Sequence, residues 1–178
     1  MTLWAVRVAG LLLAVLGAVG CATRPSADVT MPWTSGRLSV RVDAVGERSA
    51  STMNADFDLR GDGRRGELRL SSPLGMLLAA TRWTAAEAVL DTGQVTTRYA
   101  DLESLSRDAL GEALPLQAFP DWLAGRPWSG APATRQADGF EQLGWAVSLA
   151  AFGEGRLEAV RTAPPRVTVR VRLDKGAS

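Results

Sequence analysis

The amino-acid sequence predicts an α+β domain built on one curved antiparallel β-sheet. Apolar and polar residues alternate with a period of two over much of the chain from residue 36 onward, which is typical of strands with one buried face. A central segment, 101–125, instead spaces its apolar residues as a helix does. With 178 residues, 46% of them hydrophobic and 22% charged, the chain can form one domain with a buried core.

The first group of strands is predicted from this alternation and from the turns between them. Leu38, Val40 and Val42 alternate with polar residues, as Phe57 and Leu59 do further along. Glycine and aspartate mark the turns, because they tolerate the backbone conformations that tight turns require. The strands predicted in this half cover residues 36–42, 55–59, 67–70, 76–83, 88–90 and 95–99.

Two short helices are predicted between this group and the remaining strands. Asp101 suits the N-cap of a helix over 102–110, because its carboxylate can accept hydrogen bonds from free backbone amides, and Gly111 suits the end of that helix. A second helix begins at Leu114 and ends at Gly125. The strands predicted after the helices cover residues 144–152, 157–161 and 167–173.

The first 32 residues lie outside the predicted domain. Residues 1–20 hold a short apolar stretch after one basic residue, which is typical of a signal peptide and shorter than the roughly 20 residues that span a bilayer. The only cysteine, Cys21, follows directly and resembles the lipidated cysteine of a bacterial lipoprotein; an ordinary secretory signal with a chance cysteine is the alternative. We therefore expect a signal peptide at 1–20 that is removed, a lipidated Cys21 with a tether over 21–32, and one domain over 33–178.

Composition argues against several classes of function. The chain has no histidine, so it lacks the usual general base near neutral pH and the commonest metal ligand. One cysteine cannot form a Cys-pair zinc site, and a formal net charge of +1 gives no basic surface for nucleic acid. No Gly-rich phosphate-binding loop is present. We therefore expect no catalytic residue, metal, cofactor or nucleic-acid partner, and do not expect an enzyme.

One turn carries an apolar residue at its tip. Pro73 and Gly75 set the bend, and Leu74 stands between them where a polar residue is usual. Together with other segments, this turn resembles the LolB family of outer-membrane lipoprotein receptors, which act in bacterial lipoprotein sorting. The segments that carry the resemblance are Ser35-Gly36-Arg37-Leu38, Phe57-x-Leu59, Gly66-x-Leu68-x-Leu70-Ser-Ser-Pro-Leu-Gly75, Leu114-Pro115-Leu116, Trp122-Leu123-Ala-Gly125-Arg-Pro127 and Gly139-Phe140-x-Gln142-x-Gly144-Trp145-x-Val147.

The resemblance implies a fold and a function. The fold is an unclosed antiparallel β-barrel of the LolA/LolB type, with short helices capping an apolar cavity for acyl chains. The function is to accept lipoproteins from a soluble periplasmic carrier, LolA, and to insert them into the inner leaflet of the outer membrane by non-covalent transfer without ATP. Leu74 corresponds to the family's exposed loop leucine, so Pro73, Leu74 and Gly75 form the implied membrane-insertion loop. The implied protein is a monomer that faces the periplasm and is anchored to the outer membrane through Cys21.

Inward-facing positions on the predicted strands and helices nominate the residues of that cavity. These acyl-cavity candidates are Leu38, Val40, Phe57, Leu59, Leu68, Leu70, Trp83, Leu102, Leu105, Phe119 and Trp122.

Three other interpretations stay open. The chain could be a structural or protein-binding envelope lipoprotein whose barrel is filled by its own side chains and carries no lipid cargo. A lipid-processing hydrolase would need a nucleophile and a base, which the sequence does not offer. A soluble carrier of the LolA type would share the fold, and the predicted lipid anchor at Cys21 argues against it.

Overall fold

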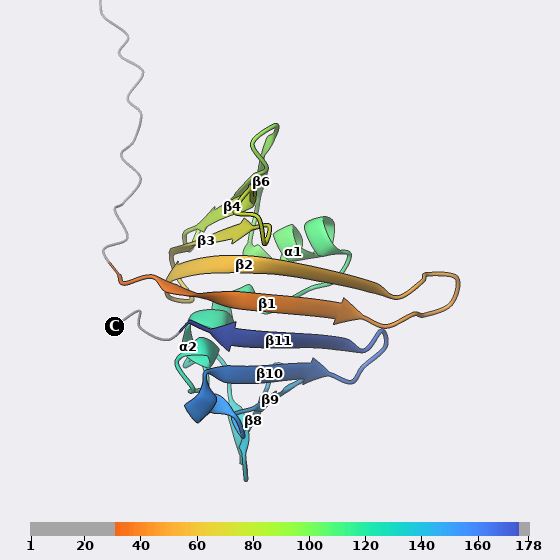
Figure 1. Ribbon diagram of the computed structural model, residues 1–178, viewed down its shortest axis with the longest axis vertical. Coiled ribbons are helices and arrows are strands. Elements are labelled where there is room, and N and C mark those ends of the chain that lie inside the picture. Colours follow the sequence, from red (N-terminus) through yellow and green to blue (C-terminus); the bar gives the residue numbers. More distant parts are fainter. Residues whose placement is uncertain (1–30, 175–178) are drawn as a thin grey trace, which may run out of the picture.

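The computed structural model describes residues 31–174, whose strands form one open antiparallel sheet. Its eleven strands run in the order β6-β5-β4-β3-β2-β1-β11-β10-β9-β8-β7, so the first and last strands of the chain pair in the middle (Figure 1). Among these strands the two edges, β6 and β7, do not pair with each other, which confirms the predicted unclosed barrel. The strands are β1 (Thr34–Val42), β2 (Ser51–Gly61), β3 (Gly66–Ser71), β4 (Leu77–Trp83), β5 (Ala88–Asp91), β6 (Thr96–Tyr99), β7 (Ala133–Gln136), β8 (Gly139–Gln142), β9 (Trp145–Ser148), β10 (Arg156–Arg161) and β11 (Val167–Leu173).

Part of the predicted domain organisation falls outside this range. The predicted signal peptide at 1–20, the predicted lipid-anchor residue Cys21 and all but the last two residues of the predicted tether lie outside the described residues. Within 31–174, no helix combines the length and the apolar character needed to cross a membrane.

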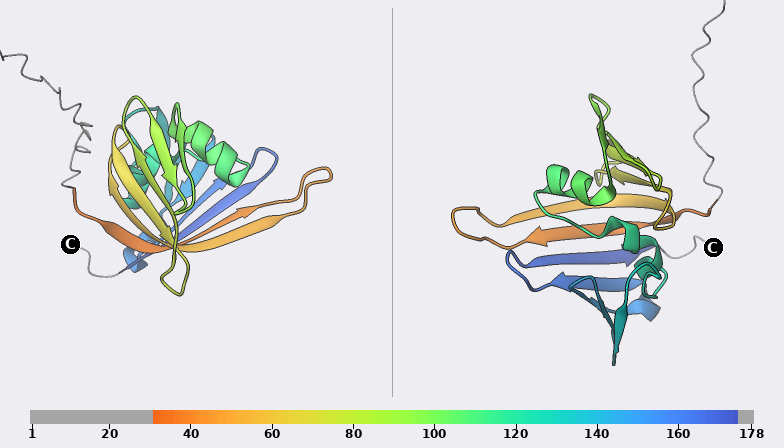
Figure 2. Two further views of the ribbon diagram at one scale, coloured as in Figure 1. Left: turned by 90° about the horizontal axis from the view of Figure 1, so that it is seen from above. Right: turned by 180° about the vertical axis from the view of Figure 1, so that it is seen from behind.

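The helices lie between the two edges of the sheet in sequence and cover its concave face in space. The chain leaves the sheet at β6, forms α1 (Leu102–Leu110), η1 (Leu116–Ala118) and α2 (Phe119–Leu123), and re-enters the sheet at β7. Figure 2 shows α1 lying across the hollow side of the curved sheet. The predicted caps of α1 are present, since the Asp101 carboxylate accepts a hydrogen bond from the amide of Ser104 at 2.7 Å and Gly111 is left-handed at φ 72°. A further short helix, η2 (Phe152–Glu154), precedes β10.

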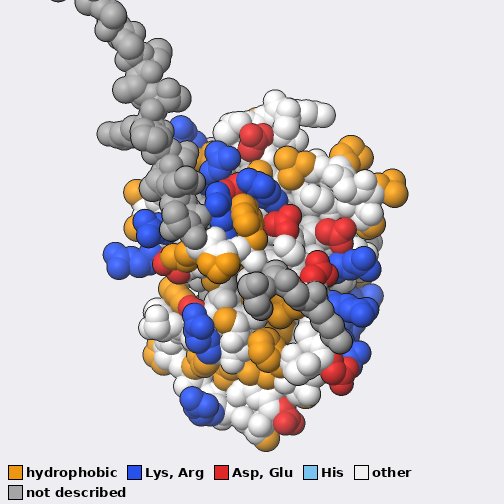
Figure 3. All heavy atoms as spheres, turned by 60° about the vertical axis from the view of Figure 1, so that its left-hand side comes forward, with side chains coloured by type: hydrophobic (Ala, Val, Ile, Leu, Met, Phe, Trp, Pro, Cys, Tyr) orange, Lys and Arg blue, Asp and Glu red, His pale blue; other side chains and the backbone are white. Residues whose placement is uncertain are grey.

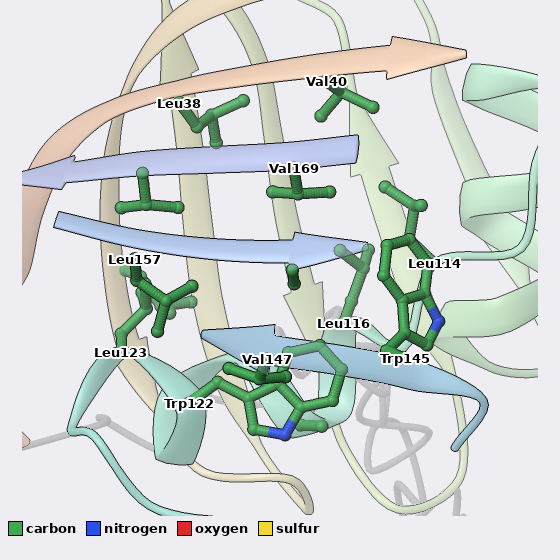
Figure 4. Packing of buried hydrophobic residues seen from close by; sticks show 14 of the residues in the cluster. Leu38, Val40, Leu114, Leu116, Trp122, Leu123, Trp145, Val147, Leu157 and Val169 are labelled. Atoms are coloured by element: carbon green, nitrogen blue, oxygen red, sulfur yellow. The ribbon is translucent and has the colours of Figure 1, made fainter. Parts of the chain in front are cut away.

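The core lies between the concave face and these helices. The alternating apolar residues of β1 and β11 face the same side because the strands pair in register, with Leu38 opposite Val171 and Val40 opposite Val169. Their side chains are buried together with Leu157 of β10 (Figure 4). The period of two in the sequence therefore places one apolar row per strand on the inner face.

Two features of the second half differ from the prediction. The strand predicted over 144–152 ends at Ser148, where the chain turns into η2, which ends at the left-handed Gly155. Strands β7 and β8 were not predicted from alternation. All four residues of β7 are exposed, and the inward positions of β8 hold Phe140 and the polar Gln142, so neither strand shows an apolar row.

Candidate functional site: an apolar cavity and an exposed apolar loop

An apolar cavity of about 250 Å³ lies between the inner face of strands β1 to β5 and the segment from α1 to α2. Its size exceeds the roughly 150 Å³ of a dry apolar cavity that binds benzene. The described lining includes no ionisable side chain. It consists of Leu38, Val40, Met53, Phe57, Leu59, Leu68, Leu70, Leu78, Ala79, Thr81, Leu90, Thr92, Leu105, Ser106, Ala109, Leu110, Leu114, Leu116, Phe119, Leu123 and Val171.

The Ser106 hydroxyl in the lining is hydrogen-bonded within the protein. Ser106 of α1 is fully buried, and its hydroxyl accepts a hydrogen bond from the amide of Leu114 at 2.9 Å and donates to the carbonyl of Glu103 at 3.0 Å. This bond ties α1 to the segment that leads into η1. Since burying a polar group without a partner is costly, such a lining favours an apolar ligand over a polar one.

Most of the acyl-cavity candidates lie in this lining, and three do not. Trp83, Leu102 and Trp122 are buried but do not line the cavity. The candidates that line it are Leu38, Val40, Phe57, Leu59, Leu68, Leu70, Leu105 and Phe119.

The three exceptions are held in packed regions beside the cavity. The Trp83 indole donates to the carbonyl of Asp62 at 3.0 Å and lies against Gly66, its partner on β3, where a Cβ atom would come within 2.3 Å of the ring. Leu102 lies in the first turn of α1, which packs against β5 and β6.

Trp122 belongs to an aromatic cluster under strands β8 and β9. Its ring centroid lies 6.2 Å from that of Phe140 and 6.3 Å from that of Trp145, and its indole donates to Gln142 at 2.9 Å. Figure 4 shows Trp122 next to Val147 and Leu123 on this side of the core. Trp122, Phe140 and Trp145 therefore pack against one another beside the cavity and do not line it.

Sequence reasoning also left out several residues that line the cavity. Val171 could have been nominated, because it shares the alternation of β11 with Val167 and Val169. Met53 of β2 could also have been nominated, because it continues the alternation of Phe57 and Leu59 in a regular strand. Others sit in helices, in irregular segments or at a strand irregularity, where a period of two gives no signal. They include Leu110, Leu114, Leu116, Leu123 and Leu78.

The turn between β3 and β4 presents its apolar residues to solvent. Leu74 is 94% exposed and Met76 is 65% exposed. The turn is closed by backbone hydrogen bonds from Gly75 to the carbonyl of Ser72 and from Ser72 to that of Met76, both 2.8 Å, and Gly75 adopts φ 81°. The structure therefore holds Leu74 at the tip of an ordered turn, and Figure 2 shows this connection projecting on the side of the sheet away from α1.

A strand irregularity connects this turn with the cavity. Ser71 pairs with Leu77 but Leu70 pairs with Ala79, so Leu78 is an extra residue on β4. Such a bulge redirects side chains relative to the regular pleat. Leu78 lines the cavity and is also 42% exposed, so the apolar lining reaches the surface four residues after Leu74.

The charged groups near the site lie on the outer face of the sheet. Burial raises the pKa of Glu67, but hydrogen bonds from Arg60 and Arg69, and the charges of Arg69 and Arg82, outweigh this and hold its pKa below the ordinary value. Arg60 and Arg69 also lie over the Trp33 ring, 4.4 and 4.6 Å from its centroid. This network fixes the start of the domain to β2 and β3. On the face of the molecule that Figure 3 shows, acidic and basic side chains are interspersed.

An open antiparallel sheet around an apolar, uncharged cavity defines a half-barrel binding protein for apolar ligands. Within the described residues, no group of three or more potential ligands could hold a metal ion. The comparison with known families agrees with this class. The chain belongs to the LolB family, whose model, described as "Outer membrane lipoprotein LolB", matches residues 33–174.

Individual relatives support the same assignment. The chain is 32% identical to an outer-membrane lipoprotein LolB of Bordetella petrii over 191 residues, which cover 98% of this chain and 95% of that protein. It is 34% identical to the protein of the same name from Cupriavidus pinatubonensis, over 79% of this chain and 70% of the relative. A third, from Chromobacterium violaceum, is 36% identical over 62% of this chain and 59% of the relative.

Proposed function

We propose that this chain is an outer-membrane lipoprotein receptor of the lipoprotein-sorting pathway. It accepts lipoproteins from a LolA-type soluble carrier in the periplasm and inserts them into the inner leaflet of the outer membrane. The main observation that supports this proposal is the apolar cavity of about 250 Å³, whose uncharged lining reaches the surface at Leu78 beside the exposed Leu74 turn. The chain works as a monomer, anchored through Cys21 and facing the periplasm.

The transfer needs no chemical step because each stage lowers the free energy of the acyl chains. Moving a methylene group out of water lowers its free energy by about 0.8 kcal/mol, whether protein or lipid then surrounds it. Any part of an acyl chain that the cavity leaves exposed gains this amount only in the bilayer. Cargo therefore moves from the cavity to the membrane without ATP, and the receptor stays in place because several acyl chains on one cysteine hold firmly.

Binding of an acyl chain can be tested directly. We expect the chain from residue 22 onward, which contains every described element, to give a saturable change in tryptophan fluorescence when titrated with a fatty-acyl probe. Unlabelled fatty acid should reverse the change by competition. A packed barrel without lipid cargo would give neither saturation nor competition, and that result would contradict the proposal.

The insertion role of Leu74 leads to a separate prediction. Burying this side chain in lipid contributes roughly 1.5–3 kcal/mol, which Leu74→Glu removes. We expect the variant to fold with unchanged stability, because Leu74 is 94% exposed, and to bind the acyl probe normally, but to deliver lipoproteins to membranes at least tenfold more slowly. Val95→Glu, at a 61% exposed position in the β5–β6 turn, is the matched control and should deliver at the wild-type rate.

A further inference from the structure

A row of arginines crosses three neighbouring strands on the outer face of the sheet. Arg172 of β11 lies directly opposite Arg37 of β1 on one side and directly opposite Arg156 of β10 on the other. All three side chains are exposed and alternate with buried residues of their strands, so they point to the same outer face. Paired residues on neighbouring antiparallel strands lie only about 5 Å apart at their Cα atoms, and like charges in this arrangement destabilise a sheet.

Carboxylates neutralise the two ends of this row and leave its middle free. Asp56 lies 3.3 Å from Arg37, and Glu154 forms an ion pair with Arg156. Arg170, two residues before Arg172 on β11 and on the same face, pairs with Glu158 at 2.6 Å. Arg172 makes no ion pair with any residue in the described range 31–174. The row therefore holds uncompensated positive charge at its centre.

The same row borders a surface hollow of about 450 Å³ that also touches the apolar turn. The hollow is lined by Arg37, Arg156, Arg170 and Arg172, by Asp56 as its acidic residue, and by Pro73. Pro73 directly precedes Leu74, so the turn that carries the exposed leucine forms one wall of the basic hollow. Figure 2 shows that this turn projects on the outer side of the sheet, the side to which the arginines belong.

We propose that Arg37, Arg156 and Arg172 bind the phosphate group of an anionic phospholipid when Leu74 enters the membrane. Guanidinium groups form bidentate hydrogen bonds with phosphate oxygens, and an anion in the centre of the row would offset the repulsion among the three arginines. An apolar residue next to a basic site matches the layering of a membrane surface, where hydrocarbon lies just below charged headgroups. This inference rests on the proposed insertion role of the turn and adds the lipid class that it recognises.

The test compares two triple variants of the chain from residue 22 onward, without its lipid anchor. Arg37→Gln/Arg156→Gln/Arg172→Gln removes the row. Its control, Arg64→Gln/Arg135→Gln/Arg166→Gln, removes the same charge from exposed positions outside the hollow. Each protein is mixed with vesicles of phosphatidylcholine alone and with vesicles containing 30% phosphatidylglycerol, and binding is measured by co-sedimentation.

We expect the wild-type chain to bind the phosphatidylglycerol vesicles more tightly than the neutral ones. Removing the row should weaken binding to the anionic vesicles by roughly 10- to 100-fold while leaving binding to neutral vesicles unchanged. The control triple variant should stay within about threefold of wild type. Equal losses in both triple variants would indicate a general charge effect and would overturn the proposal, as would no loss in either.

Two further arms separate this proposal from its alternatives. Inorganic phosphate at millimolar concentration should not abolish vesicle binding, since a site for free phosphate alone would be saturated by it. If the row variant binds vesicles normally but fails only in transfer from the carrier, the row is a protein-docking site and the proposal is wrong. Leu74→Glu reports on the proposed function separately, because it should weaken binding to neutral and anionic vesicles alike.

Discussion

At the scale of single residues, the structure separates side chains that stabilise the fold from those that are free to act. Glu67 is almost fully buried on an outer position of β3, where it contacts Arg60 at 2.8 Å and Arg69 at 2.8 Å. Leu74 is almost fully exposed and contributes little to folding. The buried Glu67 carboxylate stabilises the fold through its ion pairs, whereas the exposed Leu74 side chain is free to contact a membrane or another molecule.

Glu67 gives the first stability prediction. Replacing it with glutamine leaves Arg60, Arg69 and Arg82 without their shared anion, and because these arginines stay partly exposed to water we expect the free energy of unfolding to fall by about 1–3 kcal/mol at pH 7. Urea denaturation followed by tryptophan fluorescence measures this. Glu158→Gln is the control, because that ion pair is largely exposed, and the change there should stay below about 1 kcal/mol.

The difference in stability between wild type and Glu67→Gln is predicted to depend on pH. The pKa of Glu67 is lower in the folded state than its ordinary value of 4.5, so its stabilising contribution is complete above that value and is lost as the pH falls through the lower folded pKa. The difference in unfolding free energy between wild type and Glu67→Gln should therefore be constant from pH 7 to about 5.5 and shrink below about 4.5. A difference that grew on acidification would contradict the assignment. Glu112, whose pKa is lowered against the effect of burial by hydrogen bonds from Arg161 and Arg48, keeps some acid sensitivity in both proteins.

At the scale of elements, the open edges of the sheet are protected by their own composition. Strands β6 and β7 have four residues each, are mostly exposed, and carry Arg98 and Arg135 among polar neighbours. Short, polar and charged edge strands are a common protection against pairing with a second molecule. The composition of β6 and β7 therefore disfavours pairing of either open edge with a strand of another molecule.

Helix α1 forms one side of the cavity, and substitution of its N-cap residue is a way to destabilise it. Asp101→Ala removes the hydrogen bond to the Ser104 amide and should lower the free energy of unfolding by about 1 kcal/mol. Because Leu105 and Leu110 of this helix line the cavity, we also expect weaker binding of the acyl probe. Asp101→Asn is the control, since asparagine is an equally good cap and should retain both properties. An Asp101→Ala variant with wild-type affinity for the probe would show that α1 does not govern binding.

Elements with a regular apolar period were predictable, and those without it were not. The alternation of Leu38, Val40 and Val42 predicted β1, and Asp101 and Gly111 predicted both ends of α1. Strand β7 has no buried face, so no pattern could reveal it. The bulge at Leu78 depends on how β4 pairs with β3, which local sequence does not determine.

Within the site, the sequence predicted burial better than it predicted lining. Trp83 and Trp122 occupy inward positions, as Leu68 and Leu70 do, yet the tryptophans pack against Gly66 and Phe140 beside the cavity. The alternation of side chains along a strand shows which face of the sheet a residue occupies. It does not show whether other side chains fill the space next to that residue. That distinction depends on how the helices lie over the sheet, and only the three-dimensional structure supplies it.

At the scale of the whole molecule, the cavity that is proposed to bind acyl chains also lowers the stability of the fold. A void of about 250 Å³ in a small domain forgoes packing that the protein could otherwise gain. Ala79→Leu, on the cavity wall in β4, should fill part of this space, raise the free energy of unfolding by about 0.5–2 kcal/mol and weaken acyl-probe binding several-fold. Ala146→Leu adds the same atoms at an exposed position of β9, so it should change neither property. Urea denaturation and probe titration of the two variants give the answer. If Ala79→Leu gained stability but bound the probe as tightly as wild type, the acyl chain would bind outside this cavity, and the void would not be the binding site.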